Sequence, residues 1–476
     1  MVRGTYNTFQ KDKAWEEEPQ EVPSTVPDEL TLGHGMAILS VFMGPALFTI
    51  PYGFVMLGWS TLLIVGFSIA MMYFTATLQE AVLLEVEKAL GMPETSLRAI
   101  GVATFGRRFQ YVYSFIGIGE PFLIGSFVMW FVAIVIIEMS GVYRSVALAV
   151  ISMMGMLMAA FPGSSFLIAL GSVLAIAAVA MVCANALLLM PDHIDTHQNM
   201  FGEAHTGQGV LRSISYTFSA VALAIGDHAV FPSMRKEATP ERFQIGLKWA
   251  FVMFSVLALM LCACTYAAFG TSISHVVLNN ISCDGTGQKM PIFPGWCKSA
   301  LWLVLALRGL LCLPVFLNPL ADLIGEIADE VYPGPPGISD SELHKTIQIL
   351  DTRPLDADVE CILEVPRSQH DKKWSRWSSI CVAFTACSFF TAGIWDLTVE
   401  LEMVTGAIFK SMNVIILPCA GYLNLCGKSA EEGCALKALV LATMAFGIIW
   451  AVAGTVLAVN TETWSLLLGA FSLMRS

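Results

Sequence analysis

Long apolar segments alternate with short polar ones along most of the chain. Eleven segments are apolar over the roughly 20 residues that a helix needs to cross a bilayer. They lie at residues 32–56, 59–84, 110–137, 144–161, 165–190, 211–234, 243–269, 299–325, 377–395, 399–424 and 435–458. This pattern predicts an all-α membrane protein with about eleven transmembrane helices. Residues 463–474 are apolar but too short to cross, so residues 461–476 are expected to form a short C-terminal segment.

Two longer polar segments lie outside this pattern. Residues 1–31 are acidic and contain no apolar core, which predicts a disordered tail without a cleavable signal peptide. Residues 333–374 open with a Pro/Gly run and carry both signs of charge, which predicts a flexible loop between the eighth and ninth spans. That loop is either a solvated linker or a regulatory segment. The transporting domain of the chain is then expected at residues 32–460.

Composition excludes several classes of protein. The 476 residues are 56% hydrophobic and only 13% charged, whereas soluble domains carry about 25% charged residues. A net charge of −12 argues against nucleic acid as a partner and leaves the lipid bilayer as the expected surroundings. The sequence contains no P-loop, no HExxH and no metal-like cysteine spacing, so neither an ATP-driven pump, an enzyme nor a bound cofactor is predicted. It also lacks an Arg-rich voltage sensor, which makes a channel the weaker class.

The distribution of Lys and Arg predicts the orientation of the spans. With a cytosolic N-terminus, 19 of the 26 basic residues lie in cytosolic segments and five on the other side. The remaining two, Arg308 and Lys410, lie within spans. The expected membrane is the plasma membrane or that of a vacuole or lysosome.

The 270–298 loop is then on the external side. Asn280 begins the sequence Asn-Ile-Ser, which is an acceptor for N-glycosylation. Cys283 and Cys297 of the same loop either form a disulfide in an oxidising compartment or remain free thiols.

The first span is interrupted at its centre by Gly44-Pro45-Ala46, with a second proline at Pro51. A proline lacks the N–H group and clashes with the carbonyl four residues earlier, so Pro45 frees the carbonyl of Val41. Freed backbone groups persist in a membrane where they line a cavity or meet a ligand, and broken helices form the binding sites of many secondary transporters. The alternative is a proline kink in a passive helix.

The sixth span contains a second predicted break, between Gly226 and Pro232. Asp227 and His228 lie inside it, and ionisable residues at membrane depth are functional by default. A histidine beside a carboxylate can titrate near physiological pH, which suits a cycle coupled to protons. The alternative is a neutral His228 that only packs.

Three further charged residues lie within spans. Glu120 of the third span can pair with Arg308 of the eighth or with Lys410 of the tenth. Arg308 can also reach the outer surface, or its fixed charge can take the place of a structural cation.

Three stretches together resemble the amino acid/auxin permease family. Residues 44–53 and the following Gly58-Trp59 are similar to the family's G-A-G-[IL]-L-x-[IL]-P-Y-A…G-W signature. Gly226–Met234 is similar to its F-E-G-H-x-x-x-x-P stretch, and residues 266–270 to the end of its seventh span. The resemblance covers roughly residues 30–460.

The resemblance implies an inverted five-plus-five repeat of the amino acid–polyamine–organocation type, with helices 1 and 6 broken and an eleventh helix added. It implies that the substrate carboxylate meets amides near Gly44, Ala46 and Leu47. The α-ammonium would meet the carbonyls of Val41 and of Ala224–Asp227, with Phe122, Ser126 and Leu313 completing the pocket.

This chain departs from the family at three of these positions. Pro45 removes one amide donor, Ala46 narrows the approach to the backbone, and Asp227 is shorter than the usual glutamate. These departures bear on the identity of the substrate more than on the fold.

Together these features predict a secondary active transporter that moves amino acids by alternating access with H⁺ as the co-transported ion. The alternatives are coupling to Na⁺, an uncoupled exchanger, or an amino-acid-sensing membrane receptor. The sequence does not indicate an oligomeric state.

Overall fold

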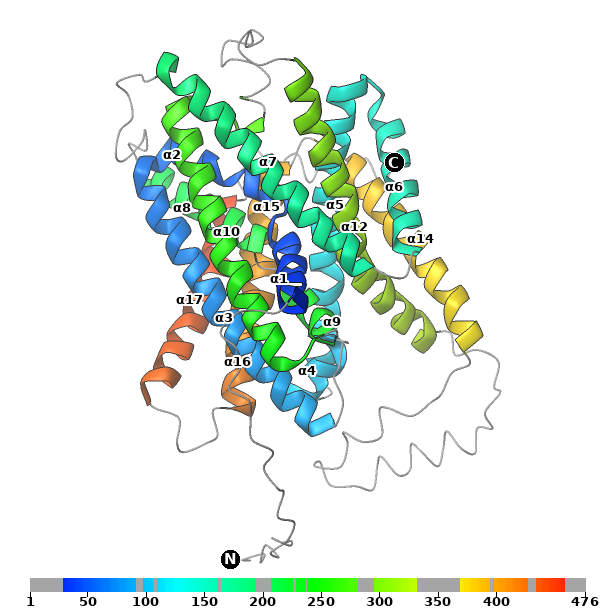
Figure 1. Ribbon diagram of the computed structural model, residues 1–476. Coiled ribbons are helices and arrows are strands. Elements are labelled where there is room, and N and C mark those ends of the chain that lie inside the picture. Colours follow the sequence, from blue (N-terminus) through cyan, green and yellow to red (C-terminus); the bar gives the residue numbers. More distant parts are fainter. Residues whose placement is uncertain are drawn as a thin grey trace, which may run out of the picture.

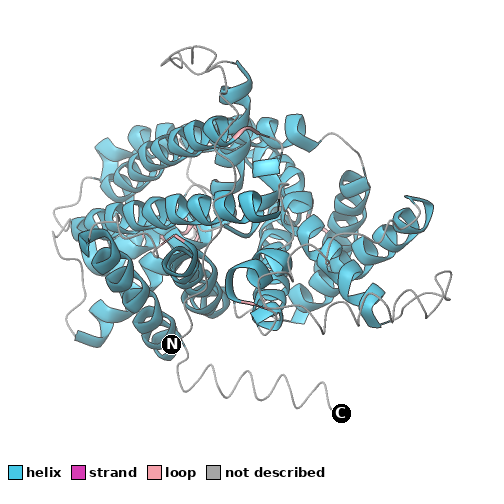
Figure 2. Ribbon diagram, turned by 90° about the horizontal axis from the view of Figure 1, so that it is seen from below, coloured by secondary structure: helices cyan, strands magenta, loops and turns pink. Residues whose placement is uncertain are grey.

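The computed structural model describes residues 29–90, 97–106, 109–160, 164–193, 207–225, 228–236, 238–278, 280, 295–331, 369–393, 395, 398–426 and 434–458. Regular structure within these ranges is helical throughout (Figure 1; Figure 2, seen from below). The long helices are α1 (Glu29–Phe42), α3 (Thr61–Leu90), α5 (Gln110–Ser140), α6 (Arg144–Ala160), α7 (Ser164–His193), α8 (Gly207–Ile225), α10 (Pro240–Phe269), α12 (Gly295–Val331), α14 (Gln369–Gly393) and α17 (Cys434–Ala458).

Shorter helices complete the interrupted spans and the connections. They are η1 (Pro45–Phe48), η2 (Ile50–Tyr52), α2 (Gly53–Leu57), η3 (Gly58–Ser60), α4 (Leu97–Phe105), η5 (His228–Val230), α9 (Phe231–Lys236), η6 (Gly270–Ser272), α15 (Thr398–Thr405), η9 (Gly406–Ile416) and α16 (Leu417–Leu425).

The prediction of an all-α membrane protein is confirmed. Among the described residues, seven helices are long and apolar enough to cross a membrane, or eight if a bent pair at the first span is counted as one. The number of eleven spans and the inverted repeat stay predictions. Helix α1 begins at Glu29 and α14 at Gln369, so both start inside segments that were expected to be unstructured, while residues 1–28, 332–368 and 459–476 lie outside the described ranges.

The predicted break of the first span is present. Helix α1 ends at Phe42 and the chain resumes as η1 at Pro45, with a bend of 62° between the two halves. Gly44 has ψ 171°, which is the extended conformation that a following proline imposes. Two other prolines within spans do not break their helices, since Pro121 lies within α5 and Pro314 within α12.

The tenth span is built from three consecutive helices of two kinds. The α-helix α15 passes into η9, an 11-residue π-helix, before the α-helix α16 begins at Leu417. π-Helical segments are rare and occur often at functional sites. This irregularity was not predicted from the sequence.

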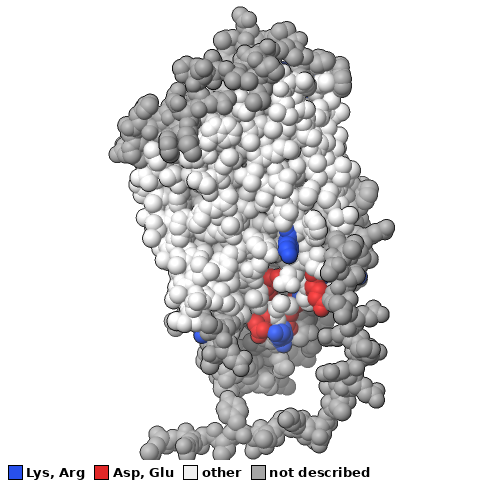
Figure 3. Space-filling model, turned by 60° about the vertical axis from the view of Figure 1, so that its left-hand side comes forward, with Lys and Arg blue, Asp and Glu red and all other residues white. Residues whose placement is uncertain are grey.

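The helices bury one large core and expose apolar side chains around it. Leu63 is 78% exposed and Phe389 77%, which suits contact with lipid rather than water. Charged side chains on the face shown in Figure 3 gather near one end of the molecule, below a wide uncharged surface. That end holds α4 and α9, and the opposite end holds α2 (Figure 1). They are called the α9 end and the α2 end below.

Candidate functional site

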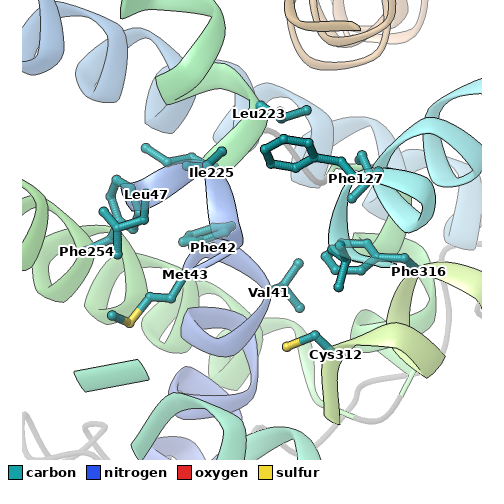
Figure 4. Packing of buried hydrophobic residues seen from close by; sticks show 14 of the residues in the cluster. Val41, Phe42, Met43, Leu47, Phe127, Leu223, Ile225, Phe254, Cys312 and Phe316 are labelled. Carbon is teal, nitrogen blue, oxygen red and sulfur yellow. The ribbon is translucent and has the colours of Figure 1, made fainter. Parts of the chain in front are cut away.

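The break of the first span lies in the interior of the bundle. Val41, Met43 and Leu47 are buried beside it. Figure 4 shows the surrounding side chains, which come from α5, α8, α10 and α12 and are mostly apolar. The predicted contacts Gly44, Pro45, Ala46 and Ala224 share this environment, and all are buried. The structure therefore places the break among four helices rather than at the lipid surface.

The backbone around the break is partly engaged. The amide of Leu47 donates to the carbonyl of Gly44 at 3.0 Å, so one of the amides expected to meet a substrate is bonded within the chain. The side chain of Val41 points toward Phe316 and Cys312 of α12 (Figure 4). Phe127 of α5 also faces the region beside Val41 (Figure 4). Phe127 and Phe316 were not predicted, because nothing in an apolar helix marks which of its aromatic residues faces the centre.

Arg308 reaches the last turn of α1. Its Nη2 donates to the carbonyl of Ser40 at 2.8 Å, and the side chain is buried. Carbonyls in the last turn of a helix lack partners farther along it, and they attract positive charge. The guanidinium therefore brings a positive charge to the end of α1 and does not reach the surface, while its role in place of a structural cation stays a prediction. Arg308 was also one candidate partner of Glu120.

Glu120 pairs instead with Lys410. Nζ of Lys410, on the π-helix η9, lies 2.7 Å from Oε1 of Glu120, and both side chains are at most 1% exposed. Asn413, one turn farther along η9, donates to the other carboxylate oxygen. Of the two pairings that the sequence left open, the structure contains this one. Glu120 and Lys410 therefore join α5 to η9 within the interior.

The predicted break of the sixth span falls partly outside the described residues and stays a prediction, although the 3₁₀-helix η5 lies within it. Helix α8 ends at Ile225 and η5 begins at His228, while Gly226 and Asp227 lie outside the described residues. His228 is buried and stacks on Phe231 with ring centroids 4.7 Å apart. Pro232 has no N–H group to donate to the carbonyl of His228. The side-chain amide of Gln79 on α3 donates to that carbonyl instead, at 3.0 Å. The freed carbonyl therefore has a side-chain partner, which the sequence did not identify.

Phe122 and Ser126 lie at the interface between α5 and α14. The ring of Phe122 packs against Phe390 at 5.0 Å. Thr391 of α14 donates to the carbonyl of Ser126 at 3.2 Å, while the Ser126 hydroxyl bonds within its own helix. A substrate role for these two residues stays a prediction, and their contacts do not argue for it. Leu313 is buried in α12.

A polar junction joins four segments at the α2 end. The hydroxyl of Thr49 lies 2.5 Å from Oε1 of Glu402 on α15, and Tyr216 of α8 donates to the carbonyl of Thr49 at 3.0 Å. Nε2 of His275, in the segment after η6, lies 3.2 Å from Oε2 of Glu402. We call these four residues the Glu402 junction. This junction was not predicted from the sequence, because its members come from four separate segments.

A second set of bonds holds the α9 end together. His34 of α1 bonds through Nε2 to the carbonyl of Met234 on α9 at 3.0 Å. Arg235 donates to Glu87 of α3 and to the carbonyl of Ala238, both at 3.0 Å. Helix α9, the second half of the sixth span, is thereby tied to both α1 and α3.

The 270–298 loop is described only in part. The side chain of Asn280 is buried, donates to the carbonyl of Ser272 and accepts from the amide of Ser274, both at 2.7 Å. A glycan on Asn280 would need space beside this buried side chain, and glycosylation stays a prediction. Cys283 lies outside the described residues, so its disulfide with Cys297 is likewise untested.

Comparison with known proteins supports the picture of a carrier. The family model described as "Transmembrane amino acid transporter protein" matches residues 32–459. A comparison with curated proteins finds no match. Among solved structures, a Na⁺-coupled sialic acid symporter in a substrate-bound outward-open state is 12% identical, with a TM-score of 0.56 over 93% of this chain and 90% of that chain.

Two other solved structures resemble the chain more weakly. The Eremococcus coleocola manganese transporter is 8% identical over 93% of this chain and 91% of that chain, with a TM-score of 0.48. Mhp1, a nucleobase-cation-symport-1 family transporter in a closed conformation with bromovinylhydantoin bound, is 11% identical over 94% and 92%, also with a TM-score of 0.48. The similarity to the sialic acid symporter shows that the fold is that of a membrane transporter.

Proposed function

Because the chain belongs to the family of transmembrane amino acid transporter proteins, we propose that it moves amino acids across a membrane by alternating access, driven by a proton gradient. The observation that carries this proposal is the break between α1 and η1, which turns the backbone by 62° in the buried centre of the bundle. Half-helices that meet at such a break offer amides to anions and carbonyls to cations. The two charged groups of an amino acid match these two kinds of backbone group.

The side chains around the break support a substrate with an apolar side chain. Val41, Phe127, Phe316 and Leu223 face this region together (Figure 4). An apolar wall with a few polar groups is the usual composition of a small-molecule site. The amides near Ala46 would hold the substrate carboxylate, and these side chains would surround the rest of the molecule.

The bonds at the two ends of the bundle support alternating access. The Glu402 junction closes the α2 end, and the bonds of His34 and Arg235 close the α9 end. The break lies between them, so a substrate at the break enters or leaves only when one set of bonds opens. Such gating bonds can exchange within the microseconds to milliseconds of a transport cycle.

Two observations favour protons over sodium as the coupled ion. The guanidinium of Arg308 already supplies a positive charge to the carbonyl of Ser40, so a metal cation is not needed there. Asp227 and His228 lie at the second break, and a buried histidine beside a carboxylate can exchange a proton in the physiological range. No nucleotide-binding motif is present in the sequence to supply another source of energy.

Transport by purified protein in proteoliposomes tests the proposal. We expect labelled neutral amino acids to accumulate under an imposed pH gradient and not under a sodium gradient alone. The Asp227→Asn variant should lose this accumulation and keep exchange of internal for external substrate, because only the titrating group is removed. Asp322→Asn, which alters an exposed carboxylate of α12, serves as the matched control.

Each alternative function predicts a different result in the same preparation. Accumulation that needs sodium would indicate a sodium-coupled carrier, and exchange without accumulation would indicate an uncoupled exchanger. Binding of amino acids without uptake would indicate a receptor. Asp227→Asn protein with an unchanged pH dependence would contradict the proton-coupling role of Asp227.

A further inference from the structure

The Glu402 junction has fewer hydrogens than its short oxygen–oxygen contacts require, which indicates where an additional proton lies. The Thr49 hydroxyl is 2.5 Å from Oε1 of Glu402 and 2.8 Å from the carbonyl oxygen of Ala46. A hydroxyl carries one hydrogen and therefore donates only one of these two bonds. If Glu402 were ionised, two acceptors would compete for that hydrogen, and one buried pair of oxygens would be in close contact with no hydrogen between them.

A proton on Glu402 resolves this competition. Oε1 then donates to the hydroxyl oxygen of Thr49, and Thr49 donates its own hydrogen to Ala46. Oxygen–oxygen distances of 2.5 and 2.8 Å both suit O–H···O bonds. We propose that Glu402 is a proton-binding site, and that its proton must be in place for the α2 end of the transporter to close. The proposal rests on the proposed function in so far as it assumes that this end opens and closes.

The other charged groups near the junction do not replace this proton. His275 is the nearest basic residue among those described, but its Nε2 at 3.2 Å from Oε2 of Glu402 lacks the alignment of a hydrogen bond. From α8, Tyr216 bonds to the backbone of Thr49, and Arg212 is exposed. Tyr52 of η2 meets His275 ring to ring at 5.6 Å.

Among the described residues, the remaining elements that pack against α15 contribute no counter-charge. Glu120 of α5 and Lys410 of η9 are paired with each other. The second half of α17, from Phe446 to Ala458, contains no titratable residue. An ionised Glu402 would therefore be buried without a well-aligned cation, and burying such a charge is costly.

Closure of the α2 end links this cost to proton uptake. Thr49 and Glu402 belong to separate elements, the second half of the first span and α15. When these elements separate, water reaches the carboxylate and stabilises its ionised form. Closing the end then requires the carboxyl group to take up a proton from that side. Above the pH at which the solvated carboxyl ionises, closure should become up to about tenfold less favourable per pH unit.

Infrared spectroscopy of the purified full-length protein tests where the proton is. We expect the C=O stretching band of a protonated carboxylic acid, and we expect Glu402→Gln to remove it. Glu138→Gln, the same change at an exposed position of α5, should leave the band in place. If the Glu402→Gln protein keeps every carboxylic acid band of the wild type, the proposal is overturned, and this result does not depend on transport. If the Gln variant does not fold, Glu402→Asp should shift the band without removing it, whereas an unshifted band would overturn the proposal.

Exchange of labelled amino acid at equal pH on both sides tests the link to closure. In the wild type, exchange should slow as the pH rises. In Glu402→Gln it should become independent of pH over the same range, because the amide nitrogen donates permanently to Thr49 as the protonated acid does. A Glu402→Gln variant with the pH profile of the wild type would overturn the linkage. Absence of amino acid exchange in the wild type would instead overturn the proposed function.

Discussion

At the scale of single residues, Glu120 and Lys410 form an ion pair whose two side chains are both fully buried inside the bundle. Removing one partner of such a pair leaves an uncompensated charge and typically costs about 3–5 kcal/mol. We therefore expect Lys410→Met to lower the free energy of unfolding by about that amount, measured by thermal or denaturant unfolding in detergent. The double variant Glu120→Gln with Lys410→Met should recover much of the loss, because no isolated charge remains.

The control for this prediction is the pair formed by Lys88 and Glu85 near the end of α3. Its side chains are 71% and 43% exposed, and exposed pairs contribute little to stability. Lys88→Met should therefore leave unfolding unchanged. Equal effects of the Lys88 and Lys410 variants would show that burial does not govern the strength of the interior pair.

Arg308 supports a second prediction, about rate rather than stability. Arg308→Gln removes the positive charge from the carbonyl of Ser40 and should slow transport by at least about tenfold, which corresponds to one charged hydrogen bond. Arg308→Lys should keep part of the activity, because it preserves the charge but not the geometry of the guanidinium. The same change at the exposed Arg212 of α8 provides the control. Uptake by Arg308→Gln at the wild-type rate would rule out this role, and a gain of sodium dependence would support it.

A residue's role could be predicted from the sequence where the role depends on neighbours along the chain. It could not be predicted where the role depends on a distant contact. Pro45 and Pro232 act on carbonyls four residues away, so the break of the first span and the freed carbonyl of His228 were predicted from these two positions alone. Glu120 and Lys410 are 290 residues apart, so the sequence could identify both but not choose between Lys410 and Arg308. Glu402 lies at the edge of an apolar span, where a carboxylate usually faces water, and nothing in the sequence marks it as buried.

At the scale of elements, the tenth span shows how a close approach between helices requires a particular residue. Gly406 begins η9 against Ser219 of α8, where an added Cβ would lie 2.5 Å from the Ser219 Cβ and 2.7 Å from its Cα. The backbone cannot yield as a flexible side chain can. The π-helix that positions Lys410 therefore begins at a point fixed by contact with α8.

Gly406→Ala should consequently destabilise the protein by about 1–3 kcal/mol, the usual cost of overpacking. The measurement is unfolding in detergent, compared with Gly66→Ala. An added Cβ at Gly66 of α3 meets nothing within 4 Å, and alanine favours the helix by about 1 kcal/mol. The two variants should therefore shift stability in opposite directions. A neutral Gly406→Ala would show that α8 and η9 can separate at no cost.

The order of the spans was easier to predict than their internal geometry. The lengths of the apolar segments predicted the positions of α3, α10 and α12 closely, because a helix that crosses a bilayer needs about 20 apolar residues. The π-helical turn of η9 and the continuous helix through Pro314 depend on neighbouring helices instead. Tertiary contacts decide such details, and a single sequence does not display them.

At the scale of the whole molecule, bonds between helices lie on both sides of the break, and under the proposed function they close the two ends of the bundle. The Glu402 junction acts at the α2 end, and Arg235 with His34 acts at the α9 end. Cys312 lies between them, buried and with its Sγ 3.9 Å from the carbonyl of Ser40. Its thiol is therefore a natural reporter for water and reagents that enter the centre from either side.

Weakening the α9 end should expose this reporter. Arg235→Gln removes the bond to Glu87, and one hydrogen bond to a charged group contributes roughly 1.5–3 kcal/mol. The open state should become about tenfold more populated or more, and alkylation of Cys312 by N-ethylmaleimide should accelerate in proportion. Mass spectrometry of the peptide that contains Cys312 separates this signal from the exposed Cys381 and Cys434.

Two comparisons make this measurement specific to the α9 end. Lys248→Gln changes an exposed charge on α10 and should leave the rate of Cys312 alkylation unchanged. Excess amino acid substrate should slow alkylation in the wild type, because a ligand at the break covers the space beside Val41 and Cys312. If Arg235→Gln alkylates no faster than the wild type, the α9 end is closed by packing alone and the Arg235 bonds do not gate it. Faster alkylation without protection by substrate would place the binding site away from the break, because only a ligand there shields this thiol.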